Sequence, residues 1–152
     1  MTDANDDSGT ILVTGGAGYI GAHISHALAS SGRRVAVLDD LSTGTADRLP
    51  DGVPFVEGDV GDARVVSAVL GDLGVTSVIH IAAKKQVGES VARPLWYYRQ
   101  NVTAMATLLE CCVHAGVDRF LFSSSAATYG MATDGLISEA PPAQPINPPG
   151  DP

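Results

Sequence analysis

The sequence predicts an α/β domain built on a doubly wound parallel sheet. Short, almost continuous apolar runs alternate along the chain with longer amphipathic segments, which is the pattern of repeated βαβ units. Hydrophobic residues make up 45% and charged residues 17% of the 152 positions, which suits one domain with a buried parallel sheet. Ligands of such sheets bind outside the carboxyl ends of the strands, so polar residues at those ends are the candidate site residues.

The first predicted unit is a strand, a glycine-rich turn and a helix. The apolar run at residues 11–13 leads into the turn at residues 14–21, and an amphipathic segment at residues 20–29 follows it. The change from an apolar run to helical periodicity across a glycine-rich turn is typical of the start of a βαβ unit.

Three glycines in this turn have separate expected tasks. Gly15 makes the tight turn, Gly18 lets the backbone approach a pyrophosphate, and Gly21 lets the helix pack close to the strand. The helix N-terminus, which includes Tyr19 and Ile20, adds unpaired N–H groups and the positive end of the helix dipole. The turn therefore predicts dinucleotide binding, and a glycine-rich turn without a ligand is the alternative.

The second predicted strand ends in a carboxylate. The run Val35-Ala36-Val37-Leu38 leads into Asp39, whose distance from Gly21 is close to the roughly 20 residues typical of dinucleotide-binding folds. A carboxylate there accepts hydrogen bonds from the adenosine ribose and repels a 2′-phosphate, which favours NAD over NADP. The glycine turn and the acid together predict a Rossmann-like domain that binds NAD.

The alternation of strand and helix continues along the chain. Three further strands are expected at residues 54–57, 77–81 and 120–122. Two further helices are expected at residues 62–73 and 95–115, the second with Gly116 as its C-cap. Asp59 and the serines at residues 123–125 follow strands, so they are expected at the same edge of the sheet as Asp39.

Charge and composition exclude several kinds of partner. The net charge of −8 argues against nucleic acids and anionic membranes, because both bind basic surfaces. No apolar run reaches the roughly 18 residues of a membrane span. Residues 1–9 are polar and acidic, which predicts a flexible tail rather than a signal peptide. We therefore expect a cytoplasmic protein.

The cysteines and the C-terminal residues add little chemistry. Cys111 and Cys112 are adjacent in a predicted helix and point away from each other, so neither a disulfide nor a metal site is expected. Residues 141–152 are rich in proline, which cannot continue a helix or a central strand, and this predicts an extended tail.

Several motifs together resemble one protein family. In chain order they are Thr14-Gly15-Gly16-Ala17-Gly18-Tyr19-Ile20-Gly21, Leu38-Asp39-Asp40-Leu41-Ser42-Thr43-Gly44, Val56-Glu57-Gly58-Asp59-Val60, Lys85-Gln86-Val87-Gly88-Glu89-Ser90, Tyr97-Tyr98-Arg99-Gln100-Asn101-Val102 and Phe122-Ser123-Ser124-Ser125. Over residues 10–150 the chain resembles the nucleotide-binding half of the UDP-glucose 4-epimerases, which are extended short-chain dehydrogenases/reductases. The resemblance implies an NAD-binding Rossmann-like domain at residues 10–140 that is incomplete at its C-terminal strands, with the substrate domain absent.

The resemblance also assigns cofactor contacts. Asp39 and the turn after it are expected to hold the adenosine ribose, and Asp59 and Val60 to flank the adenine, although Asp59 as a simple turn former is an alternative. Lys85 is expected to reach the cofactor's ribose or phosphate, the alternative being a solvated loop lysine. Asn101 is expected near the nicotinamide and substrate, the alternative being an ordinary helix asparagine. The other expected cofactor contacts are Asp40, Leu41, Ser42, Thr43, Gly44, Ile81, Ala82, Ala83 and Ser123.

The family's catalytic residues are only partly present. Its epimerases oxidise the sugar transiently with NAD, and a tyrosine acts as the base while a lysine four residues later lowers the tyrosine's pKa. Ser125 aligns with the hydroxyl that contacts the reacting sugar oxygen, the alternative being a helix or turn cap. Pro149 stands where the tyrosine is expected, the lysine would fall beyond Pro152, and Tyr129 belongs to another turn. We therefore expect no epimerase activity from this chain alone.

The substrate implied by the resemblance is a UDP-sugar. Ala126 and Ala127 stand where related nucleotide-sugar dehydratases carry an acid, which favours epimerase ancestry over the alternative of a dehydratase fragment. The lack of a hydroxyl at Ala127, which epimerases commonly carry, implies that sugar contacts differ.

The resemblance also implies a homodimer, or self-association, through the helix at residues 95–115. Without the helix that packs beside it in the family, one face of this helix is expected to be partly exposed, namely Tyr98, Val102, Met105, Leu109 and Cys112. A non-catalytic nucleotide-binding or scaffold module that pairs with full-length subunits is the alternative of a different class.

Overall fold

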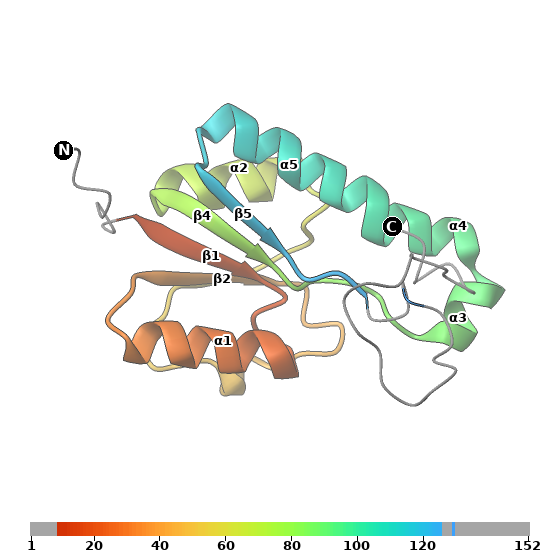
Figure 1. Ribbon diagram of the computed structural model, residues 1–152, viewed down its shortest axis with the longest axis horizontal. Helices are drawn as coiled ribbons and strands as arrows, with labels where there is room; N and C mark the ends of the chain where they lie inside the picture. Colours follow the sequence, from red (N-terminus) through yellow and green to blue (C-terminus); the bar gives the residue numbers. More distant parts are fainter. Residues whose placement is uncertain (1–8, 126–128, 130–152) are drawn as a thin grey trace.

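The computed structural model describes residues 9–125 and 129. Five strands form one parallel sheet in the order β3-β2-β1-β4-β5 (Figure 1). They are β1 (Thr10–Thr14), β2 (Val35–Asp39), β3 (Phe55–Glu57), β4 (Val75–His80) and β5 (Arg119–Phe122). From β1 the chain adds β2 and β3 toward one edge of the sheet, and then β4 and β5 toward the other edge. The predicted doubly wound parallel sheet is therefore confirmed.

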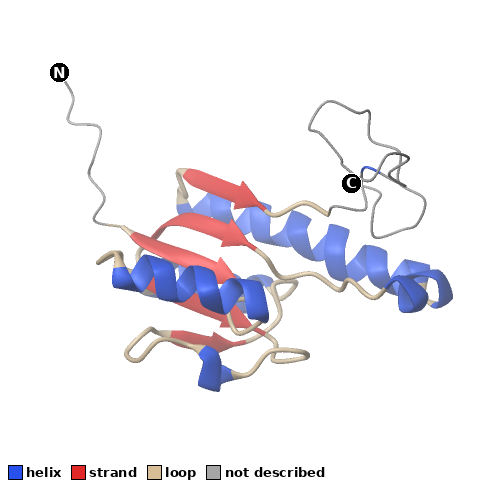
Figure 2. Ribbon diagram, turned by 60° about the horizontal axis from the view of Figure 1, so that its bottom comes forward, coloured by secondary structure: helices blue, strands red, loops and turns tan. Residues whose placement is uncertain are grey.

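Helices cover both faces of this sheet (Figure 2). Helix α1 (Tyr19–Ser30) lies on one face, and α2 (Ala63–Asp72) and α5 (Ala104–Ala115) lie together on the other. A short 3₁₀ turn, η1 (Ala46–Arg48), follows β2. This layering explains the composition, because strands that are buried on both faces need continuous apolar sequences.

Successive strand residues supply the two halves of the core. Val13 and Val37 pack in the cluster on the α1 side, whereas Leu12 and Leu38, their neighbours in the chain, pack in the larger cluster under α2 and α5. Leu12, Val13, Val37 and Leu38 are all fully buried. The central strands are therefore fixed on both sides, and their carboxyl ends are held in a constant position.

The helical region before α5 differs from the prediction. The sequence predicted one helix at residues 95–115, but the chain forms α3 (Val87–Ala92), α4 (Pro94–Tyr97) and a π-helical segment η2 (Tyr98–Thr103) before α5. Proline is well suited to the first turn of α4, because the N–H it lacks would have no partner there. The π turn adds a residue to the helical repeat, which periodicity alone does not reveal.

The unpredicted helix α3 is held against α4 by one buried phenol. The Tyr97 hydroxyl accepts a hydrogen bond from the Gln86 N–H at 3.0 Å and lies 3.1 Å from Glu89 Oε2. The Tyr97 side chain is buried. Helix α3 therefore depends on a tertiary contact, and this is why a local pattern did not predict it.

Helix ends follow their capping residues. Helix α2 begins at Ala63 because the Asp62 side chain accepts a hydrogen bond from the Arg64 N–H at 2.9 Å. The ends of the helix predicted at residues 62–73 are therefore its caps, Asp62 at the N-terminus and Leu73 at the C-terminus. Gly116 ends α5 with a φ of 71°, as predicted, because a left-handed residue is unstrained only as glycine.

Strand β4 begins earlier than predicted. It starts at Val75 rather than Ser77, since Thr10 pairs with Val75 before a register irregularity between Thr10 and Ile11. Ile81 follows the strand rather than ending it, and its N–H donates to the Thr14 carbonyl at 3.0 Å.

The predicted exposed helix face is correct except at one position. Tyr98 and Val102 are 42% and 49% exposed, and Met105 and Leu109 are half-buried. Cys112 is only 5% exposed, so the prediction for it is wrong: it packs in the larger core cluster. Burial, with a smaller effect from Cys111, raises the pKa of the Cys112 thiol to about 11.

Within residues 9–125 and 129, no helix is long and apolar enough to cross a membrane. No cluster of histidine, cysteine and acidic residues suited to a metal ion occurs in this part of the chain. The tails predicted at residues 1–9, apart from Gly9, and 141–152 lie outside the described residues.

A buried histidine ties β1 to β4. His80 Nδ1 lies 2.7 Å from the Thr14 hydroxyl, and its ring contacts the rings of Phe120 and Phe122 on β5. His80 is 3% exposed, and this burial lowers its pKa from 6.5 to about 4. The folded chain therefore binds this proton more weakly than the unfolded chain does.

We expect His80 to make the fold acid-sensitive. Its contribution to stability is complete above pH 6.5 and is lost as the pH falls toward 4, at a total cost of about 3 kcal/mol. Urea unfolding across that range measures it, with His80→Asn removing the titration and exposed His114→Asn as the matched control. The pH dependence should become shallower only in the His80 variant; parallel curves for all three proteins would contradict the assignment.

Candidate functional site

The glycine turn lies between β1 and α1 and is packed from two sides. Gly15 has a φ of 71°, and its N–H donates to the Leu38 carbonyl at 2.8 Å. A Cβ at Gly15 would lie 2.6 Å from the Ala82 backbone nitrogen. The chain after β4 therefore lies directly against the turn, and the expected tight-turn role of Gly15 is confirmed.

Gly21 lets α1 approach this turn closely. A Cβ at Gly21 would lie 2.7 Å from Gly16 Cα and closer still to the Gly15 carbonyl oxygen. These are backbone atoms that cannot rotate away, so the expected close packing of helix and turn is confirmed. Gly18 has extended backbone angles and only a moderate contact with Gly15, so its expected approach to a pyrophosphate stays a prediction.

The N-terminus of α1 is open to an anion. Among the described residues no side chain caps it, and its first turn contains no acid. Tyr19 and Ile20 are exposed there, at 73% and 52%. Uncapped N–H groups and the positive end of the helix dipole favour a bound phosphate at this point.

Asp39 is buried at the end of β2 and faces the same turn. Its Oδ2 accepts the Ala17 N–H at 2.9 Å and its Oδ1 accepts the Leu41 N–H at 2.8 Å. Each carboxylate oxygen has a second lone pair, so ribose hydroxyls can still donate to Asp39. The carboxylate is thus oriented by the backbone before any ligand binds.

The chain after β2 continues along the turn. The Thr45 N–H donates to the Ala17 carbonyl at 3.1 Å, and a Cβ at Gly44 would lie 2.8 Å from the Ala17 backbone. Leu41 adopts a left-handed φ of 53°, which is uncommon outside glycine. The predicted ribose-binding residues Asp40, Leu41, Ser42, Thr43 and Gly44 therefore form one loop held against the glycine turn; below we call it the ribose loop.

An ion pair joins the ribose loop to the chain after β4. Lys84 Nζ lies 2.8 Å from Asp40 Oδ2 and also donates to the Ser42 hydroxyl. Burial alone would raise the pKa of Asp40, but hydrogen bonds from Lys84 and Ser42 outweigh it and hold the pKa below 3.8. Asp40 is therefore ionised at neutral pH and pairs with a cation.

Asn101 fixes the backbone of Lys84. Its Oδ1 accepts the Lys84 N–H at 2.8 Å, and its Nδ2 donates to the Lys84 carbonyl at 2.9 Å. Asn101 lies in the π-helical segment η2 and is half-buried. These contacts exceed those of an ordinary helix asparagine, while the predicted position near a nicotinamide stays a prediction.

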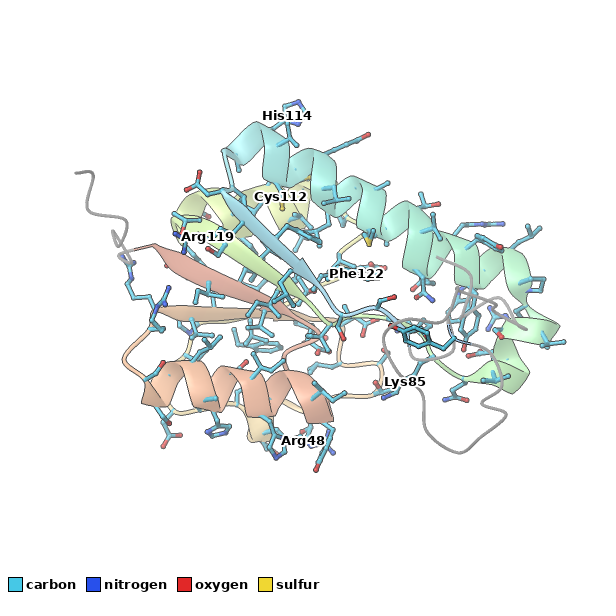
Figure 3. The ribbon with its side chains drawn as sticks, viewed as in Figure 1. Arg48, Lys85, Cys112, His114, Arg119 and Phe122 are labelled. Atoms are coloured by element: carbon cyan, nitrogen blue, oxygen red, sulfur yellow. The ribbon has the colours of Figure 1, made fainter. Side chains whose placement is uncertain are left out.

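The two neighbouring lysines behave differently. Lys85, the predicted cofactor contact, is exposed beyond the carboxyl ends of the strands (Figure 3). Lys84, to which the sequence assigns no role, makes the tertiary contacts. Adjacent positions in a loop carry no periodicity, so the sequence contains no signal that distinguishes them.

The remaining predicted residues lie at the same edge of the sheet. After β3, Asp59 Oδ1 accepts the Gly61 N–H at 2.7 Å, which is the turn-forming contact, and Val60 is buried in the core. After β5, the Ser123 N–H donates to the His80 carbonyl at 3.1 Å, and Ser123 and Ser125 are exposed. The adenine role of Asp59 and Val60 and the catalytic role of Ser125 stay predictions.

Part of the predicted catalytic region cannot be placed. Ala126, Ala127 and Pro149 lie outside the described residues, and Tyr129 is described only as an exposed residue. Ile81, Ala82 and Ala83 follow β4 beside the glycine turn, as expected. The described site thus lies at the carboxyl ends of the strands and is formed by the chain after β1, β2 and β4.

Comparisons with known proteins identify the family and the fold of this chain. The model of the NAD dependent epimerase/dehydratase family matches residues 11–151. The UDP-glucose 4-epimerase of Azospirillum brasilense is 47% identical over 150 residues, which cover 99% of this chain and 43% of that protein. The chain thus spans less than half the length of this curated relative.

Solved structures with the same fold include epimerases with ligands. The UDP-glucose 4-epimerase of Brucella ovis in complex with NAD has a TM-score of 0.87 and 41% identity, covering 93% of this chain and 43% of that one. The Thermotoga maritima UDP-glucose 4-epimerase with UDP-glucose has a TM-score of 0.85 and 34% identity, covering 93% of this chain and 46% of that one. The family match over residues 11–151, together with the shared fold, shows that this chain belongs to the NAD dependent epimerase/dehydratase family.

Proposed function

We propose that this chain is the NAD-binding part of a UDP-sugar 4-epimerase. The observation that carries the proposal is the buried Asp39 carboxylate, held by the Ala17 and Leu41 N–H groups beside an uncapped helix N-terminus. A carboxylate for ribose hydroxyls next to N–H groups for a pyrophosphate is the pairing that a dinucleotide requires.

The residues present fit NAD. Asp39 would accept hydrogen bonds from the adenosine ribose hydroxyls, and the N–H groups at Tyr19 and Ile20 would hold the pyrophosphate. The ribose loop would hold the adenosine ribose with Asp39, Asp59 and Val60 would flank the adenine, and Lys85 would reach a ribose or phosphate of the cofactor. Asn101 would lie near the nicotinamide, and Ile81, Ala82 and Ala83 would be further cofactor contacts. When bound, NAD supplies the hydride acceptor for transient oxidation of the sugar.

The choice between NAD and NADP tests this proposal. The Asp39 carboxylate is buried and negatively charged, so a 2′-phosphate beside it would be repelled. By calorimetry we expect NAD to bind at least about tenfold more tightly than NADP, a difference of ~1.4 kcal/mol. Equal affinities, or tighter NADP, would contradict the proposal.

The same proposal leaves this chain without a complete set of catalytic residues. Ser125, which follows β5, would be the hydroxyl that contacts the sugar, but Pro149, at the expected place of the tyrosine base, has no ionisable group. We infer that the 152-residue chain binds NAD without interconverting UDP-glucose and UDP-galactose. Steady formation of UDP-glucose from UDP-galactose by the purified chain would disprove this inference.

A second copy of the chain is the proposed partner of α4, η2 and α5. Leu95, Tyr98 and Val102 are 70%, 42% and 49% exposed along this helical stretch. Apolar side chains at this exposure favour association through one face. Analytical ultracentrifugation should find a dimer that Val102→Asp weakens, and a monomer at all concentrations would refute it.

A further inference from the structure

We propose that the Asp40–Lys84 ion pair is a latch that fixes the ribose loop for dinucleotide binding. This inference rests on the proposed NAD binding and adds Lys84 to the residues that position the cofactor. Lys84 Nζ lies 2.8 Å from Asp40 Oδ2 and also donates to the Ser42 hydroxyl, so one side chain holds two residues of that loop.

The pair spans the glycine turn. Asp40 follows β2, Lys84 follows β4, and β1 lies between these strands in the sheet. The glycine turn follows β1, and each flanking loop already lies against it: the Gly44 region packs on Ala17, and Ala82 lies beside Gly15. The ion pair therefore joins two loops that both border the expected path of the dinucleotide.

Lys84 is held at both ends. Asn101 makes two hydrogen bonds to the Lys84 backbone, so the direction in which the side chain leaves the loop is set by the π-helical segment. The Lys84 side chain is 20% exposed and that of Asp40 37%, which makes the pair less accessible to solvent than Arg64–Asp62, at 93% and 39%. A partly buried pair with fixed ends loses less side-chain entropy than an exposed one.

The latch has a defined consequence for binding. A loop whose conformation is already fixed loses less entropy when a ligand binds, so affinity rises without any direct contact from Lys84. The latch also orders the ribose loop in the ligand-free chain. The Leu41 and Ser42 N–H groups report on this order, because they donate hydrogen bonds to carboxylates in the same segment. The latch and a direct cation–phosphate contact thus make different predictions.

A double-mutant cycle tests the latch. NAD affinity is measured by calorimetry for the wild-type chain, Lys84→Met, Asp40→Asn and the double variant, with Arg64→Met as the matched exposed-pair control. We expect each single variant to bind about three- to tenfold more weakly, the double variant to lose no more than either single one, and the control to match wild type. Amide hydrogen exchange of residues 40–44 without NAD should be faster in Lys84→Met.

The other outcomes separate the explanations. If wild type binds NAD and both single variants bind within about twofold of it, the latch is wrong and the proposed function stands. If Asp40→Asn binds as well as wild type while Lys84→Met does not, Lys84 contacts the phosphates and the latch is wrong. If wild type does not bind NAD, the proposed function fails, and hydrogen exchange alone then tests the latch. Exchange of residues 40–44 that Lys84→Met leaves unchanged would overturn the latch. Faster exchange in Lys84→Met would show that the ion pair still fixes the loop.

Discussion

Gly21→Ala is expected to unfold a large part of the population or to displace α1. The added Cβ would lie 2.7 Å from Gly16 Cα and closer still to the Gly15 carbonyl oxygen, all of them backbone atoms of the turn. No rotamer change relieves such a contact, so the helix must move away from the turn. We expect a loss of about 3 kcal/mol or more of unfolding free energy, at the upper end for overpacking.

Gly71→Ala is the matched control for this experiment. Gly71 lies inside α2, and a Cβ there would meet nothing within 4 Å among the described atoms. Alanine costs less backbone entropy than glycine in a helix, so Gly71→Ala should stabilise the chain by roughly 0.5–1 kcal/mol. Thermal melts followed by circular dichroism measure both variants, and a Gly21→Ala melt that coincides with wild type would refute the packing assigned to this turn.

Asp39→Asn is expected to remove most of the affinity for NAD and the preference for it over NADP. The carboxylate accepts the Ala17 and Leu41 N–H groups and, in the proposed complex, the ribose hydroxyls as well. Asparagine keeps one acceptor oxygen but has no charge, and its NH₂ group faces one of those N–H donors. The loss of charge-assisted hydrogen bonds should weaken NAD binding by about 2–3 kcal/mol, or roughly 30- to 150-fold.

The NADP measurement separates electrostatics from damage to the fold. Removing the charge of Asp39 removes the repulsion of a 2′-phosphate, so NADP binding should fall less than NAD binding does. Asp118→Asn, at the exposed start of the chain leading into β5, is the matched control and should leave both affinities unchanged. An Asp39→Asn chain that still melts cooperatively and binds NAD like wild type would show that this carboxylate does not hold the ribose.

The sequence predicted the features that depend on local chemistry. The glycine turn, the acid after β2 and the Gly116 cap each require one residue type at one backbone position, and the structure has them as expected. The parallel sheet followed from continuous apolar runs, because only strands buried on both faces carry them. These features are encoded within a few neighbouring residues.

The features that the sequence did not predict depend on contacts between distant residues. Helix α3 is held by the Tyr97 hydroxyl, and Cys112 is buried in a core cluster that draws residues from several strands and helices. Lys84 differs from Lys85 only through Asn101 and Asp40, which lie in other loops and helices. No local periodicity marks such contacts, and so Lys84, which is adjacent to the predicted Lys85, was not predicted as a site residue.

Amide chemical-shift mapping with NAD tests the central claim most directly. The claim is that the 152-residue chain binds NAD along the carboxyl ends of β1, β2 and β4. Titration of NAD into the ¹⁵N-labelled chain should shift the amides of residues 15–21 and 40–44 and those after β4 together, with one saturation curve. Shifts confined to other parts of the chain, or a folded spectrum that NAD leaves unchanged, would contradict the account.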